Sequence, residues 1–437
     1  MAIAEQYPDL PLEAVFKEDL LRLGVRFTDA ALELTARSKP KAYFIFSFDM
    51  APLSDLPERQ SLHAPEEIAL VGGPHSLRRT IVSVRLNPSS PYSVDATDDA
   101  LQLHLGSVAI CDVKLAPNPA YYQSELAGGK VMREVAPTIE WGYLIYLTLF
   151  RLCQYFGAEE ECKFCDINEN FRQQRRAGRP YNQVKALDDV LAALEIIDAN
   201  EREQPEANDD DLLLPLKRTA AYTITGGSIV SELQGQSEID FYCRYVEAIE
   251  ERFPRRWISK MVVQAHEQDS LQRLRDAGVQ IYHPNYEVWD ARLFSILCPG
   301  KQRAIGHESW VRRILGAAEL MGPENVIPNF VAGVEMARPY GFERVEEALR
   351  STGEGLDFFM SRGVAPRFTT WCPEPLSQLG RAGEAAPLEY HVGLLRLWRD
   401  THRRHRLPVP RGYGDPGPGQ AVFSVSGFMD VLEPLCG

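Results

Sequence analysis

The stretch from Leu144 to Cys165 reads LIYLTLFRLCQYFGAEEECKFC. Its apolar beginning, Leu144–Leu152, has the length and composition of a buried β-strand. The segment that follows the strand directly carries Cys153, Cys162 and Cys165, with eight and two residues between them. Parallel α/β enzymes build their sites where strands end at their carboxyl side. We therefore expect the chemistry of this chain at the cysteine loop.

Downstream of this stretch, apolar strands alternate with long helical segments, which is typical of a parallel sheet made of strand-helix units. The expected strands are Leu144–Leu152, Ala220–Thr225, Ile258–Gln264, Val279–His283, Val326–Val331 and Pro366–Trp371. Six units are fewer than the eight of a complete barrel. The sequence therefore predicts an α/β fold containing a partial (β/α)6 barrel of the TIM type.

The rest of the chain divides around this expected barrel. Residues 1–139 mix helix and strand signals and predict an α+β region of unknown role, and residues 140–400 would form the barrel. Residues 401–437 include the glycine- and proline-rich segment GYGDPGPGQ and predict a loop-rich tail that packs on the barrel. A polar, acidic stretch at residues 199–211 predicts a mobile insertion.

Composition and charge restrict the class of protein. The chain has 437 residues, of which 45% are hydrophobic, enough for a large core. Its 47 basic and 61 acidic residues leave a net charge of -14, which argues against a nucleic-acid partner. The N-terminus lacks the features of a secretory signal, and no long apolar run is present. We expect a cytoplasmic enzyme with no membrane partner.

The three clustered cysteines are candidate metal ligands. In a chain without an export signal, such a cluster is more typical of metal binding than of disulfides. Iron-sulfur clusters prefer thiolates, and three ligands from one loop leave one iron of a cubane open. Zinc is the alternative, although closed zinc sites take four ligands and His104 and His266 are remote in sequence. A third interpretation is that the three cysteines are ordinary core residues.

The loop resembles that of the radical S-adenosylmethionine (SAM) superfamily. In this family, three cysteines after the first strand of a partial barrel hold a 4Fe-4S cluster, and SAM binds its open iron. The ending Cys162-Lys163-Phe164-Cys165 is typical, whereas the eight-residue first gap departs from the usual three and leaves the subfamily unidentified. The resemblance covers about Trp141 to Pro375, and it implies that Cys153, Cys162 and Cys165 bind the cluster.

The same resemblance implies residues that contact SAM. Thr225-Gly226-Gly227-Ser228 is similar to the family's Gly-Gly-Glu motif, with serine in place of glutamate. Arg303, or Lys301 in its place, would hold the SAM carboxylate, and Gly333 to Glu335 would lie near adenine. The implied cofactor-binding residues are Gly226, Gly227, Ser228, Gln264, Glu267, His283, Asn285, Arg303, Gly333 and Glu335. The alternative for the polar strand ends, which also include His266 and Glu287, is a solvated rim.

The resemblance implies an enzyme that cleaves SAM reductively and uses the 5'-deoxyadenosyl radical to abstract hydrogen from a small-molecule substrate. An electron donor such as flavodoxin or ferredoxin would supply the electron. The residues that act on the substrate are not identified. Three alternatives stay open: an enzyme that modifies a peptide or protein, a zinc or iron-sulfur protein without catalysis, and a barrel enzyme with incidental cysteines. Cys298 and Cys372, at expected strand ends, could hold a second cluster.

Overall fold

A computed structural model of the chain describes residues 6–36, 38–41, 48–51, 64–97, 100–176, 178, 183–203, 218–381 and 383–434. The acidic stretch expected at 199–211 begins in a helix and otherwise lies outside the described residues. Cys436 also lies outside them.

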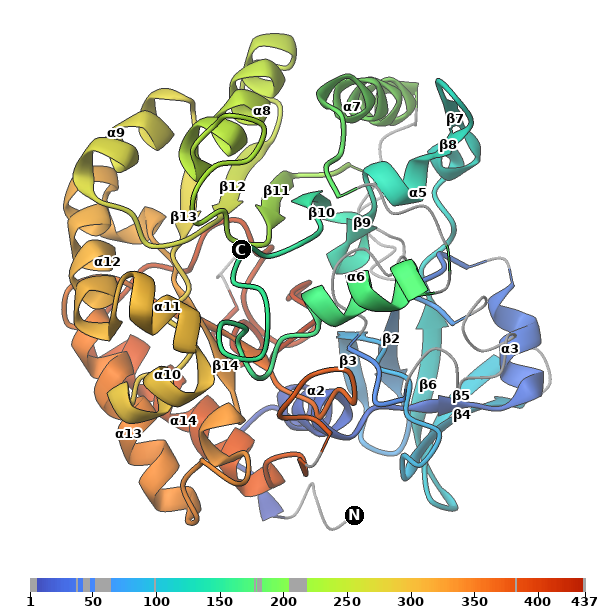
Figure 1. Cartoon of the computed structure of the whole chain (residues 1–437). Coiled ribbons are helices and arrows are strands. Elements are labelled where there is room, and N and C mark those ends of the chain that lie inside the picture. Colours follow the sequence, from blue (N-terminus) through green and yellow to red (C-terminus); the bar gives the residue numbers. More distant parts are fainter. Residues whose placement is uncertain are drawn as a thin grey trace.

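All six expected strands are present; five are shorter than their sequence pattern, and β11 has the expected length but begins and ends one residue later. They are β10 (Leu144–Phe150), β11 (Ala221–Gly226), β12 (Ile258–Val262), β13 (Ile281–His283), β14 (Asn329–Ala332) and β15 (Arg367–Thr370). Helices separate them in the chain: α6 (Ile167–Arg176), α7 (Leu187–Glu203), α8 (Glu238–Arg252), α9 (Gln268–Asp276), α10 (Ala291–Leu297), α11 (Pro299–Ala304), α12 (His307–Met321) and α13 (Val345–Met360). The long helix α14 (Leu388–Arg404) follows β15. Figure 1 shows helices α8, α9, α12 and α13 on the outside of the strands.

The parallel strands form two sheets. One has the order β13-β12-β11-β10-β9, in which the short strand β9 (Thr138–Ile139) is antiparallel to β10 and the other neighbours are parallel. The other pairs β14 with β15 in parallel. Isolated parallel bridges from Tyr282 to Val326 and from Glu287 to Phe330 connect the two sheets. The fold is therefore mixed α/β with parallel sheets, and no closed barrel is present among the described strands.

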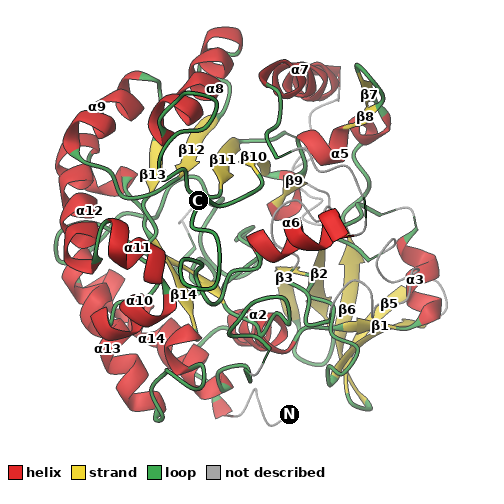
Figure 2. Cartoon of the chain, viewed as in Figure 1, coloured by secondary structure: helices red, strands yellow, loops and turns green. Residues whose placement is uncertain are grey.

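The N-terminal region contributes a separate, mostly antiparallel sheet. Its order is β1-β4-β5-β6-β2-β3, made of β1 (Arg26–Phe27), β2 (Glu67–Gly72), β3 (Leu77–Ser83), β4 (Tyr92–Thr97), β5 (Ala100–Leu105) and β6 (Val108–Leu115). Two helices accompany it, α2 (Leu12–Leu23) and α3 (Asp29–Thr35), and Thr28 caps α3 by accepting from the Ala31 amide. Figure 2 shows this sheet to one side of the helix-covered parallel strands.

The C-terminal segment lies between the N-terminal sheet and the parallel strands. The Ser83 amide donates to the Ser424 carbonyl at 2.9 Å, and the Thr370 amide donates to the Val425 carbonyl at 3.1 Å. Position 401 falls inside α14, and position 139 is the last residue of β9, which pairs with β10. The three segments expected from the sequence are thus joined by strand pairing and by one continuous helix.

Within the described ranges, every helix is too short or too polar to cross a lipid bilayer.

Candidate functional site

A cavity of about 260 Å³ opens among the parallel strands, the N-terminal sheet and the C-terminal segment. Alternate residues of the strands line it, because successive side chains of a strand point to opposite faces. They include Tyr146 on β10, Thr223 and Thr225 on β11, Lys260 and Val262 on β12, Asn329 and Val331 on β14, and Arg367 and Thr369 on β15. The cavity therefore follows the inner face of the parallel strands.

All three clustered cysteines line this cavity. The Cys153 amide donates to Asn168 Oδ1 at 2.9 Å, and the Cys165 amide donates to the Cys162 carbonyl at 3.0 Å. Burial raises the pKa of Cys153 to about 11 and raises that of Cys165, whereas a hydrogen bond from Cys298 lowers that of Cys162. Among the described residues, no three His, Cys, Asp or Glu side chains are already arranged around a metal position.

The Gly-Gly turn after β11 lies directly against the cysteine loop. A Cβ on Gly227 would lie 2.0 Å from the Leu152 carbonyl oxygen and 2.5 Å from Cys153 Cα. The Gln154 amide donates to the Ser228 carbonyl at 2.9 Å. Neither Gly226 nor Gly227 has a positive φ. Close backbone approach, and not a left-handed conformation, is therefore the reason for glycine at this turn.

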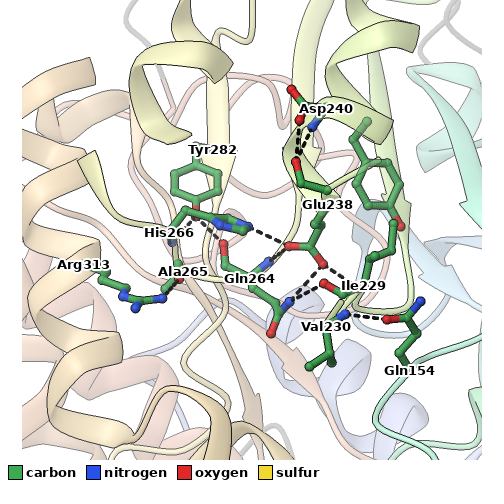
Figure 3. Close-up of polar contacts among 12 residues, drawn as sticks. Gln154, Ile229, Val230, Glu238, Asp240, Gln264, Ala265, His266, Tyr282 and Arg313 are labelled. Atoms are coloured by element: carbon green, nitrogen blue, oxygen red, sulfur yellow. Dashed lines mark hydrogen bonds and ion pairs between the residues drawn. The ribbon is translucent and has the colours of Figure 1, made fainter. Parts of the chain in front are cut away.

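A buried carboxylate connects the turn after β11 to the end of β12 (Figure 3). Glu238, the first residue of α8, accepts from the Ile229 amide at 2.9 Å and from the Gln264 amide at 3.1 Å. It also hydrogen-bonds with the Gln264 side chain at 3.1 Å and with His266 at 2.7 Å. Gln264 in turn accepts from the Tyr155 hydroxyl at 2.6 Å, inside the cysteine loop. Glu238 thus fixes Gln264 and the loop after the Gly-Gly turn.

Five of the residues implied as SAM contacts line the cavity: Gly226, Gly227, Ser228, Gln264 and Asn285. Five others are not among its lining residues: Glu267, His283, Arg303, Gly333 and Glu335.

These five residues have other partners. Glu267 is paired with Arg313 at 2.8 Å, and Arg303 is paired with Glu160. His283 is fully buried, with Nδ1 2.6 Å from the Ile327 carbonyl oxygen. Burial lowers the pKa of His283 well below its ordinary value.

Glu335 accepts from the Gly333 amide at 2.8 Å and from Thr352 at 2.8 Å. Its carboxylate therefore stabilises the turn after β14. Of the two basic residues considered for the SAM carboxylate, Lys301 lines the cavity, where it is paired with Glu287.

The two remaining cysteines of interest have different positions. Cys372 follows β15 and lines the cavity, and its thiol donates to the Phe48 carbonyl at 3.4 Å. Cys298 was expected at a strand end but lies between α10 and α11, because the region after β13 continues as helix. Burial raises its pKa well above the ordinary value, and its thiol contacts Cys162.

Sequence reasoning did not identify several residues that the cavity brings together. Lys260, Thr223 and Arg367 lie on the inner face of their strands, where period-two alternation could have found them. Glu140, which precedes β10, also lines the cavity, and Glu238, which begins α8, is not a lining residue but holds Gln264 there; nothing local in the sequence marks either one.

No protein-family model and no curated protein sequence matches this chain. Among solved structures it is similar to methylornithine synthase (14% identity, TM-score 0.38, 58% of this chain and 61% of that one). It is also similar to the hydrogenase maturase HydG (12%, 0.38, 59% and 50%). A third similar structure is coproporphyrinogen III oxidase from Escherichia coli (14%, 0.35, 60% and 52%). The chain thus matches half to about three fifths of the length of these structures. The last of these structures is a radical SAM enzyme.

Proposed function

We propose that this chain is a radical SAM enzyme whose Cys153, Cys162 and Cys165 hold a 4Fe-4S cluster. One observation carries the proposal: three thiols from a single loop line the same cavity as the Gly-Gly turn of the neighbouring strand. We also propose that the six parallel strands together form a partial barrel, with the bridges from Tyr282 to Val326 and from Glu287 to Phe330 spanning the gap between the two sheets.

The donor set fits such a cluster in kind. Thiolates are the ligands that iron-sulfur clusters prefer, and a three-ligand loop leaves one iron for SAM. Bound there, the cluster would supply the electron that cleaves SAM to methionine and the 5'-deoxyadenosyl radical that abstracts hydrogen from the substrate.

The chain's own residues would position SAM. Gly226 and Gly227 give the ligand access to backbone next to Cys153, which larger residues would block. Gln264 presents an amide that Glu238 holds in place, and Lys301, already paired with Glu287, would share its remaining protons with a carboxylate. Trp371 and Phe164 line the same cavity, and their apolar surfaces would exclude water from a reactive species.

One observation favours the competing zinc assignment. Cys298 contacts Cys162, so a fourth thiol is present, as a closed zinc site requires. The cavity beside the same thiols favours the open cluster instead, because a closed structural site needs no space for a ligand. Replacing Cys298 separates the two assignments. Cys298→Ala should keep iron and SAM cleavage if three thiols suffice, and should lose the metal if four thiols bind it.

The direct test is anaerobic purification, reconstitution with iron and sulfide, reduction in the presence of SAM, and measurement of 5'-deoxyadenosine. We expect Cys162→Ala to lose both the iron and 5'-deoxyadenosine formation. Cys243→Ala is the matched control, because Cys243 is a buried thiol on α8 outside the cavity lining. A colourless protein that binds zinc stoichiometrically, or undiminished SAM cleavage by Cys162→Ala, would refute the proposal.

The small-molecule substrate, the flavodoxin or ferredoxin donor and the cytoplasmic location stay predictions from the sequence. A peptide or protein substrate is the alternative to a small molecule.

A further inference from the structure

The cavity has a charged end that the proposed SAM chemistry does not use. Lys260, Val262 and Gln264 line it in succession along one chain segment. Lys260 precedes Gln264 by four residues, so at about 3.3 Å per extended residue the two Cα atoms are roughly 13 Å apart along the chain. Arg367 begins β15 and Glu140 precedes β10, so both lie toward the amino ends of their strands, and Lys260 lies in the middle of β12, four residues before Gln264. The cysteine loop follows the carboxyl end of β10 instead.

Glu140 is held at this end by an unusual backbone. Glu140 and Trp141 have φ angles of 55° and 58°, in the left-handed region that non-glycine residues avoid. The buried carboxylate of Glu67 accepts from both amides, and Lys39 is paired with Glu67 at 3.2 Å. Strained backbone that its surroundings hold in place is characteristic of functional positions. The N-terminal sheet thus positions the Glu140 carboxylate at the cavity.

The three charged side chains retain unused polar atoms. Glu140 is 3% exposed, and its Oε2 has no hydrogen-bond partner in the described part of the chain. The same holds for the buried Nε of Arg367. Lys260 donates to the Gly412 carbonyl at 2.8 Å and its Nζ lies 4.0 Å from the centroid of the Tyr413 ring, which leaves at least one of its three protons for a ligand. Buried polar atoms without partners are costly, so a ligand that supplies those partners is favoured here.

The charges influence one another without touching. Burial raises the pKa of Glu140 to about 7, and Lys260 and Arg367 oppose that rise. Burial lowers the pKa of Lys260 to about 8, and Glu140 opposes that fall. Glu140 Oε2 has no hydrogen-bond partner among the described residues, although Glu140, Lys260 and Arg367 all line one cavity. The carboxylate and the two cations therefore border the same cavity without forming an ion pair with each other.

We propose that Glu140, Lys260 and Arg367 form the substrate subsite, and that the substrate is a small zwitterion of the amino acid type. Its carboxylate binds Lys260 and Arg367, and its ammonium binds Glu140. This assignment rests on the proposed function of the cysteine loop and names the substrate class for the same cavity.

The charges and the wall composition support this class. A ligand with only an anion leaves the Glu140 carboxylate without a partner, and a ligand with only an amine leaves the two cations without one. Between the charged end and the cysteines the cavity is lined by Thr225, Thr369, Val262 and Val331. Their short, mostly apolar surfaces suit an aliphatic side chain. The head group held at the charged end would thus direct that side chain toward the cysteine loop.

The test uses three related probes: L-norvaline, valerate, which lacks the amine, and butylamine, which lacks the carboxylate. Each is titrated calorimetrically into the full-length protein, before and after cluster reconstitution. We expect norvaline to bind at least about tenfold more tightly than either fragment, the effect of one charge-assisted hydrogen bond. Glu140→Gln should weaken norvaline and butylamine but leave valerate unchanged. Arg367→Gln should weaken norvaline and valerate but leave butylamine unchanged.

Arg362→Gln is the control, because this arginine is exposed and caps its own helix end at the Phe358 carbonyl. Should Arg367→Gln not fold, Lys260→Met replaces it in the same crossed comparison. The proposal is overturned if the wild-type protein does not bind norvaline, if valerate binds as tightly, or if each variant weakens all three probes equally. The titration of the protein before reconstitution tests the substrate subsite separately from the cluster. Norvaline can bind there even if the cysteines prove to hold zinc, so failure of one proposal is distinguishable from failure of the other.

Discussion

Replacing Gly227 by alanine tests whether the Gly-Gly turn and the cysteine loop depend on each other. The new Cβ would lie 2.0 Å from the Leu152 carbonyl oxygen, whereas ordinary contact begins at 3.4 Å. The two backbone segments would have to separate by about 1.4 Å, the difference between those distances. Overpacking of this kind costs about 1–3 kcal/mol of the free energy of unfolding. Because the displaced atoms include Cys153 Cα, we also expect less iron per chain after reconstitution.

Gly316→Ala is the matched control for this experiment. Gly316 lies inside α12, and a Cβ there would meet nothing within 4 Å. Alanine should therefore raise the free energy of unfolding by about 0.5–1 kcal/mol through its helix propensity. Urea denaturation followed by circular dichroism measures both variants, and iron analysis follows reconstitution. Equal stability and equal iron content in Gly227→Ala and the wild-type protein would refute the close approach.

Three further predictions concern buried charges and hydrogen bonds. Lys17→Met should lower the free energy of unfolding by about 3–5 kcal/mol, because it leaves the Asp430 carboxylate buried without the ammonium that lies 2.6 Å away. Replacing Lys17 and Asp430 together by apolar residues should recover much of this loss, as measured by urea denaturation. Burial lowers the pKa of His391 to about 3, below the ordinary 6.5, so the unfolded chain binds its proton first and stability falls as the pH drops through 6.5. Between pH 7 and pH 5 this residue should cost about 2 kcal/mol, which His391→Leu should abolish in unfolding measured at both pH values; an unchanged pH dependence would contradict the assignment. Glu238→Gln should cost about 1–3 kcal/mol and speed amide exchange at Gln264, because one acceptor becomes a donor that faces the Gln264 amide groups.

The sequence located the parallel strands well. The strands after residue 144 appear in the expected order. These elements follow from local periodicity, because burial of one face repeats every two residues in a strand and every three to four in a helix. The three cysteines likewise reach one cavity because one short loop carries them all.

Side-chain direction beyond the strand ends was not predictable in the same way. Gln264 and Glu267 are three residues apart, yet Gln264 lines the cavity and Glu267 is exposed beside Arg313. The turn that the chain takes after β12 decides this difference, and α9 begins directly after Glu267. A polar residue near a strand end is therefore a candidate whose orientation depends on the following turn.

The sequence by itself determined the order of strands and helices and the candidate metal ligands, since both are recorded over short spans of chain. Only the tertiary structure decided which distant residues share the cavity. Cys298 reaches Cys162 through the packing of α10 and α11. Glu140, which precedes β10, lines the same cavity as Lys260 on β12 and Arg367 on β15. The alternation within one strand can show which of its residues share a face, but which strands and segments bring those faces together depends on strand order and packing, which no single segment records.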